Sequence, residues 1–89
     1  MKKVITAIYD KCTGFMDPVV TVTQEEAIRG FRFALTEKNS PIGFSPADFD
    51  LYQLGFYDTT TGHIDASLNP VFLCNGALTI SGEVGDLHD

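Results

Sequence analysis

A six-residue pattern, Tyr-Asp-x-x-Thr-Gly, constrains the fold more than any other feature, because it occurs twice in 89 residues. One copy runs from Tyr9 to Gly14 and the other from Tyr57 to Gly62, and each lies between two apolar, β-prone runs. An aspartate side chain can accept hydrogen bonds from the N–H groups of a turn, and a glycine supplies the positive φ that returns the chain to the ladder. The pattern therefore predicts two tight hairpins. Their structural turn residues are Asp10, Thr13, Gly14, Asp58, Thr61 and Gly62.

Between the two hairpins the sequence carries the start signals of a helix. Thr23 is a good N-cap, and Glu26 three residues later completes a capping box. We expect the helix to run from Gln24 to Lys38. Apolar residues at helical spacing predict the stripe that packs on the sheet: Ala27, Ile28, Phe31, Ala34 and Leu35. Gly30 costs up to about 1 kcal/mol relative to alanine inside a helix, and it is compatible with a close backbone approach.

The first hairpin should join a strand at 3–9 to a partner at 15–22. Pro18 then belongs at an edge or a bulge, because proline cannot donate a hydrogen bond to a central ladder. The loop after the helix should be anchored in the core by Phe44 and Phe49.

The second hairpin should join a strand at 50–57 to a strand at 64–68, where apolar and polar residues alternate and predict one buried face. The Asn-Pro dipeptide at 69–70 should end this strand. Residues 77–80 fit a short extra strand, and residues 82–89 fit an acidic, partly flexible tail.

This order of elements predicts an α+β fold: a small antiparallel sheet of four or five strands from two hairpins, with one α-helix packed on one face. A single domain should span residues 1–76 in the order β-β-α-loop-β-β, and residues 77–89 should add the extra strand and the tail. An antiparallel sheet leaves its other face to solvent or to a second subunit. Seven Phe and three Tyr are many for so small a core, so we keep a homo-oligomer as an expectation.

The net charge of −6 is unevenly distributed. Residues 1–38 carry six basic and five acidic groups, giving +1, whereas residues 39–89 carry seven acidic and no basic groups, giving −7. Strong nonspecific binding to duplex DNA is therefore not expected, because it requires many neutralised phosphates. No apolar run approaches the roughly 18 residues of a membrane helix, and no cleavable signal segment is visible. Cys12 and Cys74 should be ordinary reduced thiols, although a disulfide stays open if they meet.

The sequence offers no catalytic constellation. His63 and His88 have no nucleophile near them in sequence, and Cys12 has no visible base. Two Cys and two His without paired spacing make a poor zinc site. Asp10 and Asp58 could be metal ligands, but turn capping explains both carboxylates more simply. We therefore expect no enzymatic activity, no metal and no cofactor.

One face of the predicted helix is a candidate contact surface. Phe33 lies opposite the apolar stripe, and Arg29 and Arg32 lie on the same exposed arc. Such a face can contact a subunit, a partner protein or a stacked base. It can equally be a solvated face with local Glu–Arg pairs, and both interpretations stay open at this point.

Several short motifs occur in a fixed order over about residues 3–76. They are Ile8-Tyr9-Asp10-x-x-Thr13-Gly14-Phe15, Ala27-Ile28-Arg29-x-Phe31, Ser40-Pro41, Pro46-x-Asp48-Phe49-x-Leu51, Gly55-x-Tyr57-Asp58-x-x-Thr61-Gly62 and Asn69-Pro70. In this order and spacing they resemble the small nonstructural protein of gokushovirus-type microviruses, which are small phages with circular single-stranded DNA genomes. The resemblance implies a protein absent from the mature capsid, with a role in DNA binding or in the switch toward single-stranded genome synthesis. It carries over no catalytic residues.

We therefore expect a noncatalytic phage protein of the host bacterial cytoplasm that acts in genome replication or packaging, through single-stranded DNA or a phage or host replication protein. Single strands suit the chain because stacking on exposed rings supplies about 1–3 kcal/mol per base. The candidate contact residues are Lys3, Lys11, Arg29, Arg32 and Phe33. The alternative is a homo-oligomeric interaction module that engages a host or phage protein without binding DNA.

Overall fold

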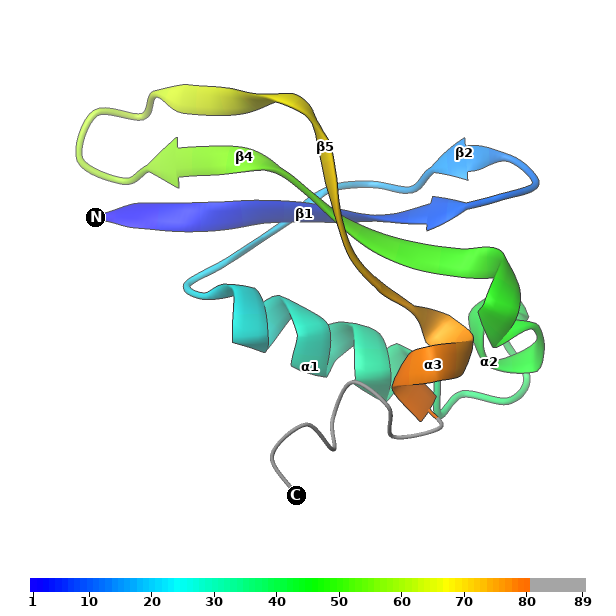
Figure 1. Ribbon diagram of the computed structural model, residues 1–89. Coiled ribbons are helices and arrows are strands. Elements are labelled where there is room, and N and C mark those ends of the chain that lie inside the picture. The colour runs from blue at the N-terminus through cyan, green and yellow to red at the C-terminus, as the bar shows by residue number, and fades with distance from the viewer. Residues whose placement is uncertain (81–89) are drawn as a thin grey trace.

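The computed structural model describes residues 1–80, which form a curled antiparallel sheet with helices on one side (Figure 1). The predicted acidic tail, residues 82–89, lies outside the described residues. The strands are β1 (Lys2–Asp10), β2 (Gly14–Phe15), β3 (Val19–Thr21), β4 (Phe49–Asp58) and β5 (Ile64–Asn75). The helices are α1 (Gln24–Ala34), α2 (Pro41–Phe44), the 3-10 helix η1 (Pro46–Asp48) and α3 (Gly76–Ile80). The predicted α+β class and antiparallel sheet are confirmed.

The sheet has the order β2-β1-β4-β5, and β3 also pairs with β1. The expected partner strand at 15–22 is therefore two short strands, which pair with different parts of β1: Phe15 lies opposite Tyr9, and Val20 lies opposite Ile5. Pro18 falls in the gap between them, where its missing N–H group interrupts no ladder.

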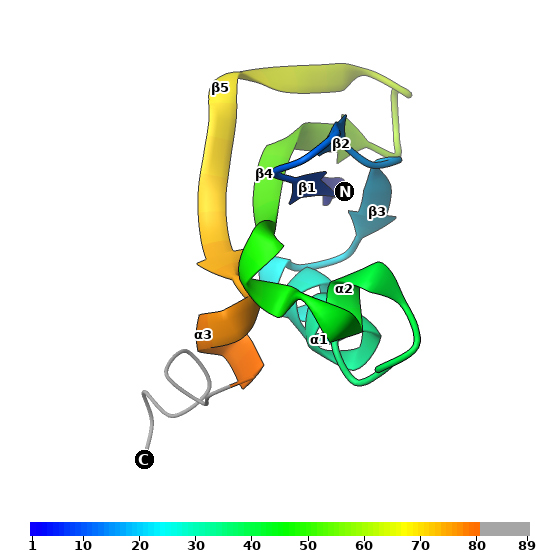
Figure 2. The same ribbon diagram turned by 90° about the vertical axis from the view of Figure 1, so that its right-hand side faces the viewer.

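Strand β5 differs most from expectation. It continues through the Asn-Pro dipeptide to Asn75, because it is an edge strand on which proline is tolerated. The predicted buried face is also wrong, since Ile64 is 62% and Leu68 is 97% exposed. The register explains the exposure of Leu68: Gly55 pairs with Ala66 and the nearby Gln53 pairs with Val71, so residues 67–70 bulge out of the ladder. Ile64 stays in the ladder opposite Tyr57, on the face that carries no helix. Figure 2 shows β5 bending sharply around β4.

Helix α1 begins as the sequence predicts. The Thr23 hydroxyl oxygen accepts a hydrogen bond from the Glu26 N–H group at 3.1 Å, while the Glu26 carboxylate accepts one from the N–H group of Val22 at 2.8 Å. The helix ends at Ala34, four residues before the predicted end. Beyond Ala34 the N–H groups of Thr36 and Glu37 donate to carbonyl oxygens three residues back, Phe33 at 3.0 Å and Ala34 at 3.2 Å, so the α-helical spacing is lost. The Thr36 hydroxyl also donates to the carbonyl oxygen of Phe33, at 2.7 Å.

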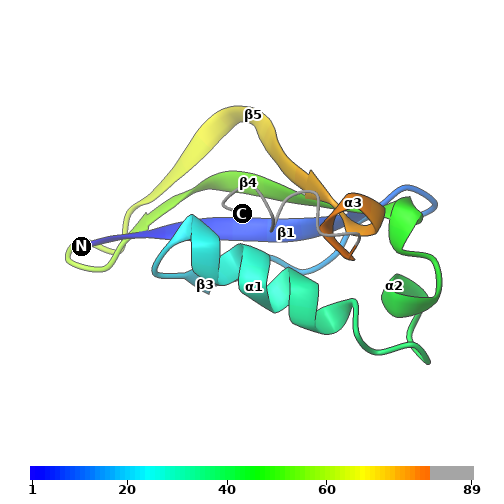
Figure 3. The same ribbon diagram turned by 60° about the horizontal axis from the view of Figure 1, so that its bottom comes forward.

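The core lies between α1 and the sheet, and α1 runs along β1 (Figures 1 and 3). The predicted helix stripe is confirmed: Ala27, Phe31 and Leu35 are buried, and Ile28 and Ala34 pack against them. The remaining core members are Ile42, Phe49, Leu51 and Cys74.

Phe49 anchors the loop as expected, whereas the prediction for Phe44 is wrong, because this ring is 81% exposed. The short helix α2 turns Ile42 and Gly43 inward, and Gly43 packs so closely on the backbone of Glu37 that Phe44 is left facing outward.

Residues 77–80 form part of helix α3 and not the predicted extra strand. Asn75 causes this change, because its side-chain oxygen accepts a hydrogen bond from the N–H group of Ala77 at 2.9 Å. Its amide nitrogen donates to the Asp50 carboxylate at 2.7 Å, which fixes the end of β5 on β4. Helices α1, α2 and α3 all lie below the sheet in Figures 1 and 2, so its other face carries none of them.

Candidate functional site

The two repeated motifs build similar turns. In the first, the Asp10 carboxylate accepts a hydrogen bond from the N–H group of Cys12 at 2.9 Å, and Thr13 donates its N–H group to the carbonyl oxygen of Asp10 at 3.1 Å. In the second, the Asp58 carboxylate accepts one from the N–H group of Thr60, also at 2.9 Å. Gly14 and Gly62 have φ values of 112° and 79°, a conformation that side-chain-bearing residues rarely adopt.

The second turn also holds the start of the chain. Thr59 donates both its N–H and its hydroxyl group to the carbonyl oxygen of Met1, at 2.8 and 3.0 Å. The N-terminal ammonium group donates to the Thr60 hydroxyl at 3.2 Å and lies 3.9 Å from the Asp58 carboxylate. The Thr60 N–H group holds the pKa of Asp58 below its ordinary value of 3.8, and the N-terminal charge acts in the same direction. Asp58 therefore has a structural task beyond capping its own turn.

The helix face predicted as a contact surface exists as one patch on α1. Arg29, Arg32 and Phe33 are exposed, Phe33 by 71%, and residues three or four apart are neighbours on a helix. Within residues 1–80 neither arginine forms an ion pair, so the local Glu–Arg pairs considered above are absent there. The nearby Glu26 instead caps the helix through Val22. Both guanidinium groups can thus offer their donors to an anion.

Lys3 and Lys11 do not join this patch. Lys3 lies near the start of β1 and Lys11 directly follows its end, so a step of eight residues along an extended chain separates them by about 26 Å. Lys3 pairs with Tyr57, and alternation places its side chain on the face opposite α1. The amine of Lys11 donates to the carbonyl oxygen of Ala47 at 3.0 Å, next to η1. The five predicted contact residues thus lie on at least three separate surfaces.

A row of four aromatic rings on the helix-free face of the sheet was not predicted from the sequence. Tyr52 lies at its centre, with its ring centroid 5.9 Å from Tyr9, 5.5 Å from Phe15 and 5.7 Å from Phe72, and Tyr9 and Phe15 are 4.8 Å apart. Phe15 and Phe72 remain 47% and 52% exposed. The signal in the sequence was the excess of aromatic residues, but only the strand register places these four together.

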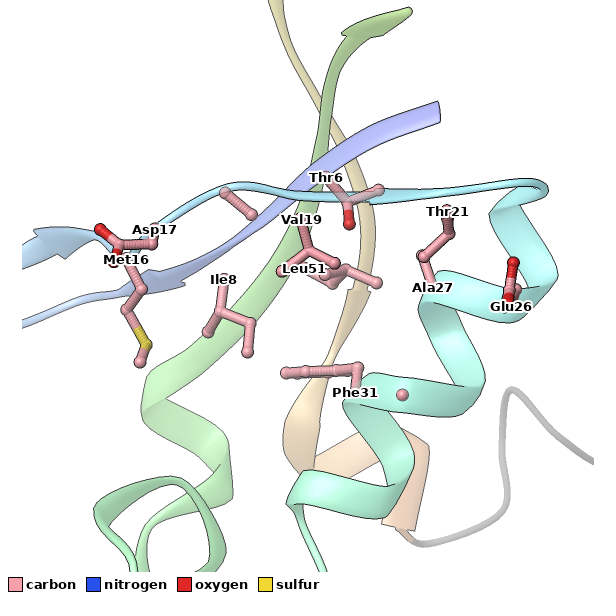
Figure 4. A pocket seen from close by; sticks show the side chains of 12 residues that line it. Thr6, Ile8, Met16, Asp17, Val19, Thr21, Glu26, Ala27, Phe31 and Leu51 are labelled. Carbon is pink, nitrogen blue, oxygen red and sulfur yellow. The ribbon is translucent and has the colours of Figure 1, made fainter. Parts of the chain in front are cut away.

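A cavity of about 390 Å³ opens between α1 and the strands β1 and β3 (Figure 4). Its walls are mostly apolar and include Ile8, Phe31 and Leu51, with the Asp17 and Glu26 carboxylates at its margin. Gly30 borders it, and a methyl group added there would touch nothing within 4 Å. The close backbone approach considered for Gly30 is therefore not present among the described residues.

The two cysteines are free thiols. Cys12 is exposed in the first turn, and Cys74 is buried in the core, where burial raises the pKa of its thiol.

No group of three or more His, Cys, Asp or Glu in residues 1–80 is placed to hold a metal ion. In the same residues no helix is long and apolar enough to span a membrane.

Comparison with known proteins identifies a family. A family model described as Phage ORF5 protein matches residues 3–78. No curated protein and no solved structure matches the chain. The matched residues include both repeated turns, α1 and all four rings of the aromatic row.

Proposed function

The chain belongs to the phage ORF5 protein family, and from that premise we propose that it is a noncatalytic, nonstructural protein that acts in phage genome replication or packaging. It does so by binding short single-stranded DNA, directly or together with the replication machinery. The resemblance of the ordered motifs supports the narrower proposal of a gokushovirus-type microvirus protein, and its proposed place of action is then the host bacterial cytoplasm.

One observation carries the proposal: an exposed ring lies beside two guanidinium groups that have no ion-pair partner within residues 1–80. Phe33 can stack on a base, while Arg29 and Arg32 can bind the phosphates on either side. Base stacking contributes about 1–3 kcal/mol and depends little on sequence, because every base has a π face. The acidic second half of the chain repels longer tracts, so the bound segment is short.

Fluorescence anisotropy with labelled oligonucleotides tests this proposal. The full chain should bind single strands at micromolar protein in low salt, and affinity should fall as salt is raised. Phe33→Ala should weaken binding about fivefold to a hundredfold, as loss of one stacked base requires. Arg29→Glu should weaken it further, whereas Lys38→Glu, the same charge change just beyond α1, is the matched control. No binding by the full chain in any oligomeric state removes the direct DNA role.

The second candidate is an interaction module that engages a phage or host protein without DNA. The apolar cavity beside α1 supports it, because apolar pockets with a few polar groups at the margin suit an inserted side chain. This candidate predicts a pulled-down partner whose binding is weakly salt-dependent and is reduced by Gly30→Leu, which would project a side chain toward the cavity. A matched Lys38→Leu variant, which places the same side chain at an exposed position outside the cavity lining, should not change partner capture.

A further inference from the structure

We infer that the helix-free face of the sheet is the interface through which two copies of this chain form a two-fold dimer. This inference does not depend on the proposed DNA binding, which uses the opposite side of the molecule. The face is defined by the aromatic row (Tyr9, Phe15, Tyr52 and Phe72) together with Val20 and Ile64.

The strand register places these residues on one face. Tyr9 and Tyr52 each follow a residue that points into the core, Ile8 and Leu51, so both tyrosines point away from α1. Phe15 pairs with Tyr9 and Phe72 pairs with Tyr52, and paired residues share a face.

Val20 and Ile64 extend the face toward the other end of the sheet. Val20 pairs with Ile5, which also alternates away from the core, and Ile64 pairs with Tyr57. Their side chains are 47% and 62% exposed. The apolar surface therefore includes residues of every strand of the sheet.

Contacts among the four rings hold their side chains in fixed positions on this face. Tyr52 contacts three rings in edge-on geometry, and such ring pairs attract each other beyond the effect of the area they bury. Rings held this way lose little side-chain entropy on association, which favours a specific contact over a loose one.

The charge distribution favours a second copy of this chain as the partner that covers this face. Each copy carries a net charge of −6, so two copies repel each other unless they meet where acids are few. On this face Asp50 is only 6% exposed and accepts a hydrogen bond from Asn75, and Lys3 lies at one end. Among the residues placed on this face only Lys3 is basic, which disfavours DNA, because DNA phosphates need several basic partners. A second copy of this chain fits this mostly apolar surface better than a nucleic acid does.

The exposed rings alone provide a substantial part of the area that a small dimer interface buries. The exposed halves of Phe15 and Phe72 contribute about 200 Å², since a fully buried ring covers about 150–250 Å². A small specific interface buries about 600 Å² from each copy. The rings thus supply about a third of this area, and Val20 and Ile64, which are 47% and 62% exposed, add apolar area at the other end of the sheet. Two-fold symmetry brings the aromatic row of one copy against the aromatic row of the other. An apolar surface can contact its own copy in this way without a second, differently shaped patch.

The test is the solution mass of the full chain by light scattering and sedimentation velocity, from low micromolar to hundreds of micromolar protein. The expected mass is twice the 9.7 kDa of one chain. Phe72→Glu and Val20→Glu should each give monomers, because a carboxylate would meet its symmetry mate in an apolar contact. Phe33→Glu and Phe44→Glu are matched controls, since these rings are also exposed but lie outside the face, and both should remain dimeric.

Far-ultraviolet circular dichroism verifies that each variant is folded. If Phe72→Glu unfolds, Val20→Glu tests the dimer interface instead, because Val20 lies on β3, which contributes no ring to the aromatic row. A wild-type chain that stays monomeric throughout overturns the inference, and so does a dimer that both face variants preserve or that the Phe33 variant abolishes. The inference is also overturned if the protein is monomeric and the face variants lose oligonucleotide binding, because the face would then bind DNA. The proposed function is tested by anisotropy, so either idea can fail alone.

Discussion

Replacing Gly30 with alanine should make the protein more stable, which is unusual for a single substitution. Gly30 lies inside α1, with six helical residues before it and four after it. Its backbone does not have a positive φ, and an added methyl group would touch nothing within 4 Å. The substitution therefore removes the conformational freedom of glycine in the unfolded chain without creating a clash in the folded one.

The expected gain in the free energy of unfolding is about 0.8–1 kcal/mol, which is the difference in helix propensity between the two residues. For a domain of this size, this corresponds to a rise in Tm of about 4–8 °C. Urea denaturation followed by circular dichroism measures the free energy, and a thermal melt measures Tm. The slope of the urea transition should not change, because the exposed area on unfolding is almost the same.

Gly43→Ala is the matched control. Gly43 is buried, and a methyl group there would collide with the backbone carbonyl group of Glu37, so stability should fall by about 1–3 kcal/mol or more. Unchanged or reduced stability in Gly30→Ala would refute the reasoning. It would mean that the backbone at Gly30 is covered by something outside residues 1–80, such as a partner at the cavity.

Three further substitutions or treatments test local features. Thr23→Ala should lower the free energy of unfolding by about 1 kcal/mol in urea denaturation, because the Glu26 N–H group loses its cap; an unchanged midpoint would contradict this. Asp58→Asn should lower Tm at pH 7 and flatten its pH dependence. The depressed pKa of Asp58 gives stability that is present above pH 3.8 and is lost as the pH falls below it, so equal acid sensitivity in both proteins would count against the turn. Iodoacetamide should modify exposed Cys12 in the native protein and buried Cys74 only in urea, and equal native rates by mass spectrometry would be incompatible with the described core.

The placement of the candidate contact residues depended on both sequence and structure. Helical spacing was enough to put Arg29, Arg32 and Phe33 on one exposed arc, because positions three and four apart are always neighbours on a helix. It could not relate them to Lys3 and Lys11. Lys3 belongs to a strand whose faces are set by pairing with β4, where its partner Tyr57 is far along the chain. Lys11 lies in the turn after that strand and is placed by its hydrogen bond to Ala47.

The two repeated turns show what short-range chemistry determines. In each, the aspartate reaches an N–H group two residues away and the glycine takes a positive φ, so six consecutive residues contain nearly all the information. The start of α1 is equally local, since Thr23 caps a group three residues later. The antiparallel α+β class follows from these local signals together with the apolar stripe of the helix.

Tertiary structure decided the rest, because those features depend on residues that meet only after the chain has folded. The length and exposure of β5 follow from its edge position and from its shifted pairing with β4. Phe44 is exposed because Gly43 takes the close contact with the backbone of Glu37. The aromatic row joins Tyr9 to Phe72 across the sheet, and a shift of one residue in any pairing would send a ring to the opposite face. Sequence thus determined the turns and the helix, whereas strand register, a long-range property, decided which side chains share a surface.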